Sequence, residues 1–339
     1  MITGAFPISD ASHVSAVRRG ASDLAHRLGF SETRTGQVAL AVTELSTNIL
    51  KHAQRGEVLV TECRAGESRG LEMLALDSGP GFPNVEQAMR DGHSTAGSLG
   101  HGLGSVQRNT DQFEIFSRPT RGAAALCRVW ETPRSSFITA TVPQFAIAGV
   151  CVAKPGEEVC GDAWAATIGV EKATVIVADG LGHGLLAAEA AWAALEAFAR
   201  GPDLPPAAIL GDVHAALRAT RGAAVAVLSV VFDKDAVSFA GLGNIAASIV
   251  TDNARRSLIS HNGTAGHSAR TVQEFTYPVA RGSTVIMHSD GLGTQWDPAE
   301  YPGLWSSDPA IVAGVLYRDF SRRRDDVTVL AGRLGARLQ

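Results

Sequence analysis

A polar stretch at residues 131–144, ETPRSSFITATVPQ, divides the chain into two parts whose hydrophobic patterns differ. Before it, apolar residues recur first at helical spacing and then in strand-like runs. After it, many short strand-like runs are interrupted by helical segments. The two prolines and the polar composition are typical of a linker. Because 339 residues are also long for one core, we predict two domains, over residues 1–137 and 143–336.

Composition excludes several classes of protein. Hydrophobic residues make up 45% of the chain and charged residues 19%, which is typical of a globular protein. The net charge of −4 gives no electrostatic reason to bind nucleic acid or an anionic membrane. The N-terminus has neither the basic start nor the apolar core of a signal peptide, and no apolar run approaches the ~20 residues that span a bilayer. We therefore expect a cytoplasmic protein without a nucleic-acid or membrane partner.

The first part reads as helices followed by an antiparallel sheet. Apolar spacing predicts one helix over 12–28 and a second from the capping residue Ser31 to about His52. A glycine-rich stretch to Gly104 then precedes a short helix that starts near Ser105. Strands are predicted at 57–63, 71–77, 112–117 and 124–130. This order favours a two-layer α/β sandwich.

Polar residues in this part are spaced as a nucleotide site requires. Glu44 and Asn48 are four residues apart, so they share one face of their helix. Asp77 ends a strand and is followed by the turn Ser-Gly-Pro-Gly. GHGLG at 100–104 opens a helix, where free backbone N–H groups and the helix dipole favour a polyphosphate. Taken singly, the glycine run is more often a loop and Glu44 more often a solvated charge; their combination is specific.

Three segments in this order, TELSTNILKHA (43–53), LDSGPGF (76–82) and GSLGHGLGS (97–105), resemble the boxes of the GHKL (Bergerat) ATP-binding fold. The resemblance covers about residues 8–130. Within that fold they look most like the small serine kinases that act as anti-sigma factors or stressosome switch kinases. It implies that Glu44 is the general base and that Asn48 binds Mg²⁺. Asp77 would accept a hydrogen bond from the adenine amino group of ATP. Gly79 and Gly81 would leave room for the adenine, and Gly100, Gly102 and Gly104 would bind the phosphates.

The second part carries aspartates at the ends of strand-like runs in four distant segments. The pentapeptide GLGHG at 180–184 follows the run ATVIVAD and precedes a helix. The four segments contain Asp162, Asp179, Asp290 and the pair Asp325–Asp326. Carboxylates arranged in this way suit a hard cation with water ligands. For any one of them alone, a turn residue is the commoner explanation, since Asp-Gly is frequent in turns.

VADGLGHG, GDAW, HSDGLG and RDDVTVL resemble the metal-dependent type 2C protein serine/threonine phosphatases, in their bacterial sporulation and stress-response branch. This resemblance covers about residues 145–335 and implies an α-β-β-α sandwich. It implies two Mn²⁺ or Mg²⁺ ions that activate water for attack on phosphoserine. Asp179 would bridge the two ions, and the Gly180 carbonyl would help to hold the first. Asp290 and Asp325 would hold the second ion, and Asp162 would act through metal-bound water. The role of Asp326 stays open. Ala163–Ala166 replace a second acid of many relatives, which puts a third metal in doubt.

The resemblances together imply a bifunctional switch in a partner-switching pathway. Its kinase and phosphatase would act on STAS-domain regulators of the stressosome or anti-anti-sigma type. The alternative is that the first domain only binds nucleotide and sequesters a sigma factor or docks on a scaffold. In that case the phosphatase alone is catalytic. The presence of Glu44 argues against the alternative, because binding alone needs no base.

Overall fold

The computed structural model describes residues 3–66, 68–85, 102–133, 144–252, 254–269 and 272–335. The chain forms two compact units, over residues 2–140 and 141–339, each with its own hydrophobic core. In the described part of the chain, no helix is both long and apolar enough to cross a lipid bilayer.

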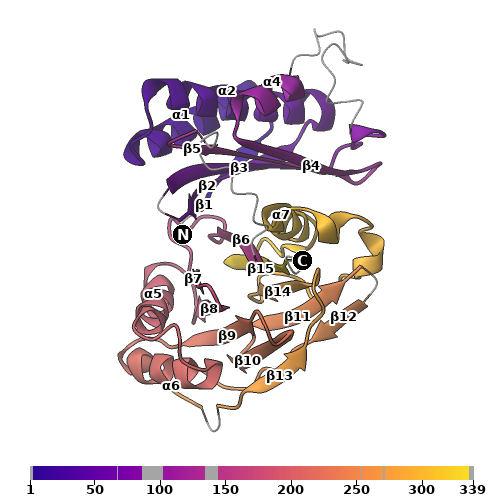
Figure 1. Ribbon diagram of the computed structural model, residues 1–339. Helices are drawn as coiled ribbons and strands as arrows, with labels where there is room; N and C mark the ends of the chain where they lie inside the picture. The colour runs from indigo at the N-terminus through magenta and orange to yellow at the C-terminus, as the bar shows by residue number, and fades with distance from the viewer. Residues whose placement is uncertain are drawn as a thin grey trace. The chain divides into compact units, whose positions relative to one another are not determined.

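The first unit is a five-stranded antiparallel sheet with helices on one face (Figure 1). The strand order is β1-β2-β3-β5-β4, and the strands are β1 (Thr3–Ile8), β2 (Gly56–Ala65), β3 (Ser68–Asp77), β4 (Gln112–Arg118) and β5 (Gly122–Trp130). The helices are α1 (Ala11–Arg27), α2 (Glu32–Asn48) and α4 (Gly102–Asn109). The two-layer α/β sandwich of the GHKL type is confirmed.

Helix α2 forms where its pattern predicts. The Ser31 hydroxyl accepts a hydrogen bond from the Arg34 amide (3.3 Å), which satisfies a free donor of the first turn. Val38 and Leu45 belong to the buried face that packs into the core of this unit. The α-helix ends at Asn48 and continues into one π-helical turn, Ile49–Ala53. The predicted helix end near His52 therefore lies within this turn.

Strand β1 was not predicted. Its sequence TGAFPI contains Gly and Pro, which weaken a strand pattern, yet it pairs along its whole length with β2, from Thr3 opposite Thr61 to Ile8 opposite Gly56. Proline is tolerated there because β1 is an edge strand.

The second unit packs two five-stranded sheets face to face between layers of helix (Figure 1). One sheet has the order β13-β10-β9-β8-β7 and the other β12-β11-β14-β15-β6. The strands are β6 (Phe145–Val152), β7 (Asp162–Ile168), β8 (Lys172–Gly180), β9 (Ala223–Val231), β10 (Ala236–Leu242), β11 (Ala246–Thr251), β12 (Ala254–Ser257), β13 (Phe275–Pro278), β14 (Thr284–His288) and β15 (Val327–Leu334). The predicted α-β-β-α sandwich is confirmed.

The helices of this unit cover opposite faces. Helices α5 (Leu185–Ala199) and α6 (Pro206–Ala216) pack on the first sheet, and α7 (Pro309–Phe320) packs on the second. The main core lies between the sheets, and a second core lies beneath α5 and α6. The sequence predicts helices at about 184–200, 206–219 and 308–320, and all three are present. It also predicts the strands β6, β8, β9, β10, β14 and β15, but it misses β7, β11, β12 and β13.

Candidate functional site

In the first unit, α2 and the start of α4 bring three predicted residues together. A Cβ placed on Gly102 would lie 3.2 Å from Glu44 Oε2 and 3.4 Å from Asn48 Oδ1. Both α2 side chains are half-buried, as expected at the rim of a core. The Asn48 amide nitrogen is buried and has no hydrogen-bond partner among the described residues. A polar atom of this kind is costly unless a ligand pairs with it, so these residues fit a Mg²⁺–nucleotide site.

Asp77 lies at the same end of α2. A Cβ on Gly56 would meet both Ile49, in the π-helical turn, and the Asp77 Cβ (3.3 Å). The Asp77 carboxylate accepts a hydrogen bond from the amide of Gly79 (2.8 Å), which closes the turn after β3. A Cβ on Gly79 would lie 2.6 Å from that of Ala53, so a side chain has no room there.

Two further glycines of the predicted site are also explained by packing. Gly81 has φ of +67° and lies against the carbonyl of Arg118, so a side chain would be both strained and obstructed. Gly104 is buried inside the first turns of α4. Gly100 was predicted to cradle phosphate, and it lies outside the described residues.

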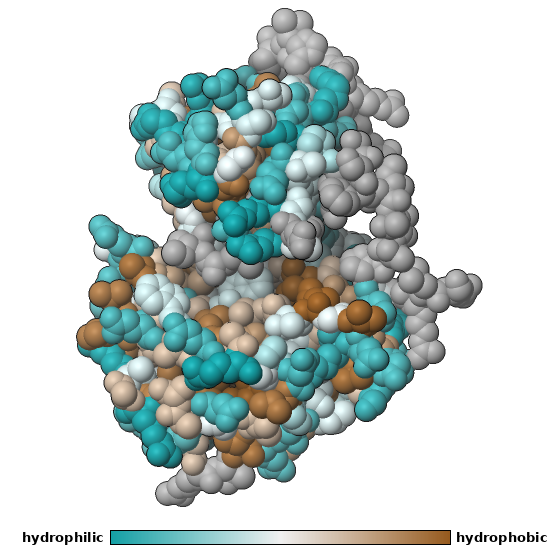
Figure 2. All heavy atoms as spheres, turned by 60° about the vertical axis from the view of Figure 1, so that its left-hand side comes forward, coloured by the Kyte–Doolittle hydropathy of each residue, from teal (hydrophilic) through white to brown (hydrophobic). Residues whose placement is uncertain are grey.

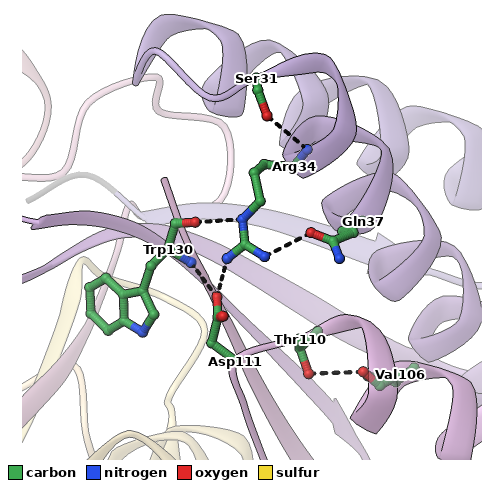
Figure 3. A network of polar contacts seen from close by, with 7 residues as sticks. All are labelled: Ser31, Arg34, Gln37, Val106, Thr110, Asp111 and Trp130. Carbon is green, nitrogen blue, oxygen red and sulfur yellow. Dashed lines mark hydrogen bonds and ion pairs between the residues drawn. The ribbon is translucent and has the colours of Figure 1, made fainter. Parts of the chain in front are cut away.

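A buried polar network, which the sequence did not reveal, holds the start of α2 (Figure 3). Arg34 donates hydrogen bonds to the Trp130 carbonyl and to Gln37, both at 2.7 Å, and forms an ion pair with Asp111. The Asp111 carboxylate also accepts from the Trp130 amide (2.8 Å). The network joins α2 to the residue before β4 and to the last residue of β5. It therefore fixes the helix that carries Glu44 against the sheet.

In the second unit, four distant segments bring their aspartates to one end of the sandwich. Asp162 is the first residue of β7 and pairs directly with Asp179 of β8. Asp290 follows β14, and Asp325 and Asp326 immediately precede β15. Burial, followed by the charges of these four neighbouring aspartates, raises the pKa of Asp179 to about 9. The charges of the five aspartates therefore act on one another at this end of the sandwich.

The deepest members of this carboxylate cluster are Asp162 and Asp326. Burial raises the pKa of Asp162 to about 7 and is also the main cause that raises the pKa of Asp326. Asp326 accepts a hydrogen bond from the Lys154 amide (2.8 Å), and its other oxygen lies against Gly161. The Oδ2 atoms of both aspartates are buried and have no hydrogen-bond partner among the described residues.

Buried carboxylate oxygens without donors fit a hard divalent cation, which repays their lost hydration. As the side chains stand, no three His, Cys, Asp or Glu residues in the described ranges are close enough to enclose one ion. The buried oxygens of Asp162 and Asp326 thus suit a cation, while Asp179, Asp290 and Asp325 stay predicted ligands.

Asp290 is held by a residue that the sequence analysis did not single out. The Asn244 side-chain amide, in the turn between β10 and β11, donates to Asp290 Oδ2 (2.7 Å). Beside it, Ser289 accepts through its hydroxyl from the Thr328 amide (2.9 Å), which pins the end of β14 to β15. The Gly-Leu-Gly-Asn sequence indicates a turn, but it does not indicate the contact with Asp290, which lies 46 residues further along the chain.

The two glycine–histidine pentapeptides differ in structure. Gly102 and Gly104 of the first lie in helical backbone, whereas Gly182 and Gly184 of the second have φ of +92° and +71°. Gly180 has no room for a Cβ because the Ala187 carbonyl of α5 lies against it. The first motif opens a helix, and the second turns the chain sharply between β8 and α5.

Comparison with known families agrees with both units. A model described as a histidine kinase-like ATPase domain matches residues 8–127, and the Stage II sporulation protein E (SpoIIE) model matches residues 170–334. The serine/threonine-protein kinase RsbT of Bacillus subtilis (strain 168) is 32% identical over 117 residues, which are 34% of this chain and 88% of RsbT. The phosphoserine phosphatase RsbX of the same organism is 23% identical over 182 residues, which are 53% of this chain and 90% of RsbX.

Solved structures show the same fold for the second unit. RsbX in complex with magnesium superposes with a TM-score of 0.52 at 21% identity, covering 57% of this chain and 98% of RsbX. The phosphatase domain of SpoIIE from Bacillus subtilis, with a fragment of its regulatory domain, gives 0.52 at 16% identity, covering 97% of this chain and 94% of that one.

The fold and the family matches define a histidine kinase-like ATPase domain joined to a domain with the fold of type 2C phosphatases. Through its first unit the chain belongs to the RsbT-like serine/threonine-kinase family, and its second unit carries the SpoIIE-type domain.

Proposed function

We propose that the chain is a bifunctional protein serine kinase and phosphatase that acts on STAS-domain regulators in a partner-switching pathway. The observation that supports the proposal is that the two units carry different groups of polar residues, which suit opposite reactions. One places Glu44 and Asn48 over the helix start at Gly102, and the other gathers five aspartates. RsbT and RsbX are named as a kinase and a phosphoserine phosphatase, which supports the pairing of activities. We further propose domain limits of 1–137 and 143–336 and a cytoplasmic location.

In the kinase site, Asn48 would hold Mg²⁺ and Asp77 would accept the adenine amino group of ATP. The α4 start with Gly102 and Gly104 would present its amides to the phosphates. Glu44 would take the proton from the substrate serine hydroxyl as its oxygen attacks the γ-phosphorus. When bound, Mg²⁺ neutralises part of the phosphate charge. The residues of the chain position the ATP and the substrate serine.

Incubation with γ-labelled ATP and the STAS-domain proteins of the same genome tests the kinase. Glu44→Gln should abolish transfer of label while ATP is still bound. Glu32→Gln, at the start of the same helix, is the matched control. If ATP is bound by the wild-type chain but no partner is labelled, the first domain is a nucleotide-dependent module that binds a sigma factor or another downstream regulator.

In the phosphatase site, Asp179, Asp290 and Asp325 would hold two Mn²⁺ or Mg²⁺ ions with the Gly180 carbonyl, and Asp162 would act on them through water. Bound metal supplies an activated water at neutral pH. The chain fixes the ligand positions through the pairing of β7 with β8. Hydrolysis of p-nitrophenyl phosphate with Mn²⁺, lost in Asp179→Asn, tests this half.

Opposed activities on one serine would consume ATP without result. We therefore propose that the two sites act on different phosphoserines or partners, or that one is gated. Time courses of partner phosphorylation, with Glu44→Gln and Asp179→Asn each in turn, decide this. An identical phosphosite for both activities, with both running freely, would contradict it.

A further inference from the structure

An arginine that none of the roles above uses lies beside the turn between β8 and α5. The Leu181 amide donates a hydrogen bond to the Gly222 carbonyl (3.0 Å), which continues the pairing of β8 with β9 beyond the strand ends. Arg221 therefore lies opposite Gly182. Its Nη1 atom is 3.1 Å from the position that a Cβ on Gly182 would take. The guanidinium covers the glycine turn that follows the carboxylates.

Arg221 is exposed, and its guanidinium forms no hydrogen bond or ion pair with any residue in the described ranges. Arg323, from the basic run before β15, differs: it contacts the Tyr317 hydroxyl (3.1 Å) and lies over that ring. An arginine offers donors in a planar fork that matches two oxygens of one phosphate. Arg221 is therefore available to bind phosphate beside the glycine turn that follows Asp179.

A guanidinium at this place suits a phosphate ester. The phosphoryl group is anionic, so Arg221 would attract it in addition to the metal ions proposed above. The arginine would do so without occupying the carboxylates that are proposed to hold the metal.

Large apolar side chains border the same turn. Leu181, Leu185 and Leu186 are 43%, 57% and 49% exposed, and Trp192, seven residues after Leu185 on the same helical face, is 41% exposed. The opposite face of α5 is buried and made of alanines such as Ala187 and Ala191. Apolar side chains also reach the surface of this unit among the polar ones in Figure 2. Exposed leucines grouped beside a site are typical of a protein-binding surface.

We propose that Arg221, Leu181, Leu185 and Leu186 form a docking surface for a phosphorylated protein segment. Arg221 binds the phosphoryl oxygens, and the leucines pack against apolar residues that flank the phosphoserine. The occupant is argued from charge complementarity and from the continuity of this surface with the carboxylate cluster. The inference rests on the phosphatase activity proposed above and names the substrate class of that site.

The first test uses p-nitrophenyl phosphate with Mn²⁺, and inorganic phosphate as inhibitor. Arg221→Ala should raise KM and the inhibition constant of phosphate about tenfold, as expected for one charge-assisted hydrogen-bonding group, with kcat nearly unchanged. Arg221→Lys should recover part of the loss. Arg218→Ala removes an exposed arginine three residues away and should behave as the wild type. A wild-type KM in Arg221→Ala overturns the role of Arg221.

The second test compares two synthetic phosphoserine peptides of equal length, one flanked by leucines and the other by serines. The wild-type chain should favour the leucine peptide in kcat/KM, and Leu185→Ser with Leu186→Ser should remove that preference. Ile259→Ser, at an exposed apolar residue outside this surface, should keep it. Equal preference in the double variant and the wild type overturns the docking surface. Failure of the wild-type chain to hydrolyse any of these esters would instead overturn the proposed phosphatase itself.

Discussion

Asp162 lies directly opposite Asp179 in the antiparallel pairing of β7 and β8, so two carboxylates face one another at the end of a sheet. Burial is the main cause that raises the pKa of both groups. The charge of Asp162 adds to it for Asp179, and the charges of Asp326 and Asp290 add to it for Asp162. Near neutral pH this arrangement lowers the stability of the folded chain, because two like charges are buried together. A bound divalent cation or the loss of one charge removes that destabilisation.

Asp179→Asn should raise the melting temperature of the metal-free chain at pH 8 and remove the further rise caused by Mn²⁺ or Mg²⁺. The pKa of about 9 lies above the ordinary 3.8, so the folded state binds this proton more tightly than the unfolded state. Stability therefore falls as the pH rises between those values, and the advantage of the variant should shrink toward pH 4. Scanning calorimetry measures the melting temperatures, and the variant Asp212→Asn, at an exposed residue, is the control. A lower melting temperature for metal-free Asp179→Asn at pH 8 would contradict this account.

Asn244→Ala should weaken metal activation without unfolding the second unit. The Asn244 amide orients Asp290 through a 2.7 Å hydrogen bond, and loss of such an outer partner typically costs ~10–100-fold in metal affinity. Titration of p-nitrophenyl phosphate hydrolysis with Mn²⁺ gives the half-activating concentration. Ser238→Ala, on the exposed side of β10, serves as control. An unchanged Mn²⁺ requirement would show that Asp290 needs no such support.

Gly102→Ala should leave the first unit folded but weaken ATP binding about tenfold or more, since the new methyl group would sit 3.2 Å from Glu44 Oε2, where the phosphates and Mg²⁺ are expected. Gly36→Ala, in α2, meets nothing within 4 Å and should stabilise the unit by ~0.5–1 kcal/mol through helix propensity alone. Isothermal titration with ATP and a thermal melt separate the two effects. Wild-type ATP affinity in Gly102→Ala would place the phosphates elsewhere.

Arg34→Ala should destabilise the first unit by ~3–5 kcal/mol, the range found when one partner of a buried ion pair is removed. Among the described residues, the change leaves the buried Asp111 carboxylate with the Trp130 amide as the one remaining partner of its side chain. Urea unfolding followed by circular dichroism measures the loss. The exposed Arg18→Ala on α1 is the comparison and should be nearly neutral. A neutral Arg34→Ala would mean that α2 is held by its apolar face alone.

Features with a short sequence range could be predicted. Glu44 and Asn48 share a helix face because the helical repeat places residues four apart together, and Ser31 caps that helix as its sequence indicates. The glycine turn after Asp179 is likewise local, and so are the three long helices of the second unit.

Contacts between distant segments depended on the tertiary structure. Asn244 meets Asp290 across 46 residues, Arg34 meets Asp111 across 77, and Arg34 meets the Trp130 carbonyl across 96. The periodic spacing of residues does not predict such pairs, because the order of the strands and the packing of the layers decide which strand ends meet. The sequence by itself therefore determined the helices, the turns and the kinds of donor in each site. Only the fold decided that Asp326 joins the carboxylates and that Arg221 lies over Gly182, since each depends on how separate strands are paired.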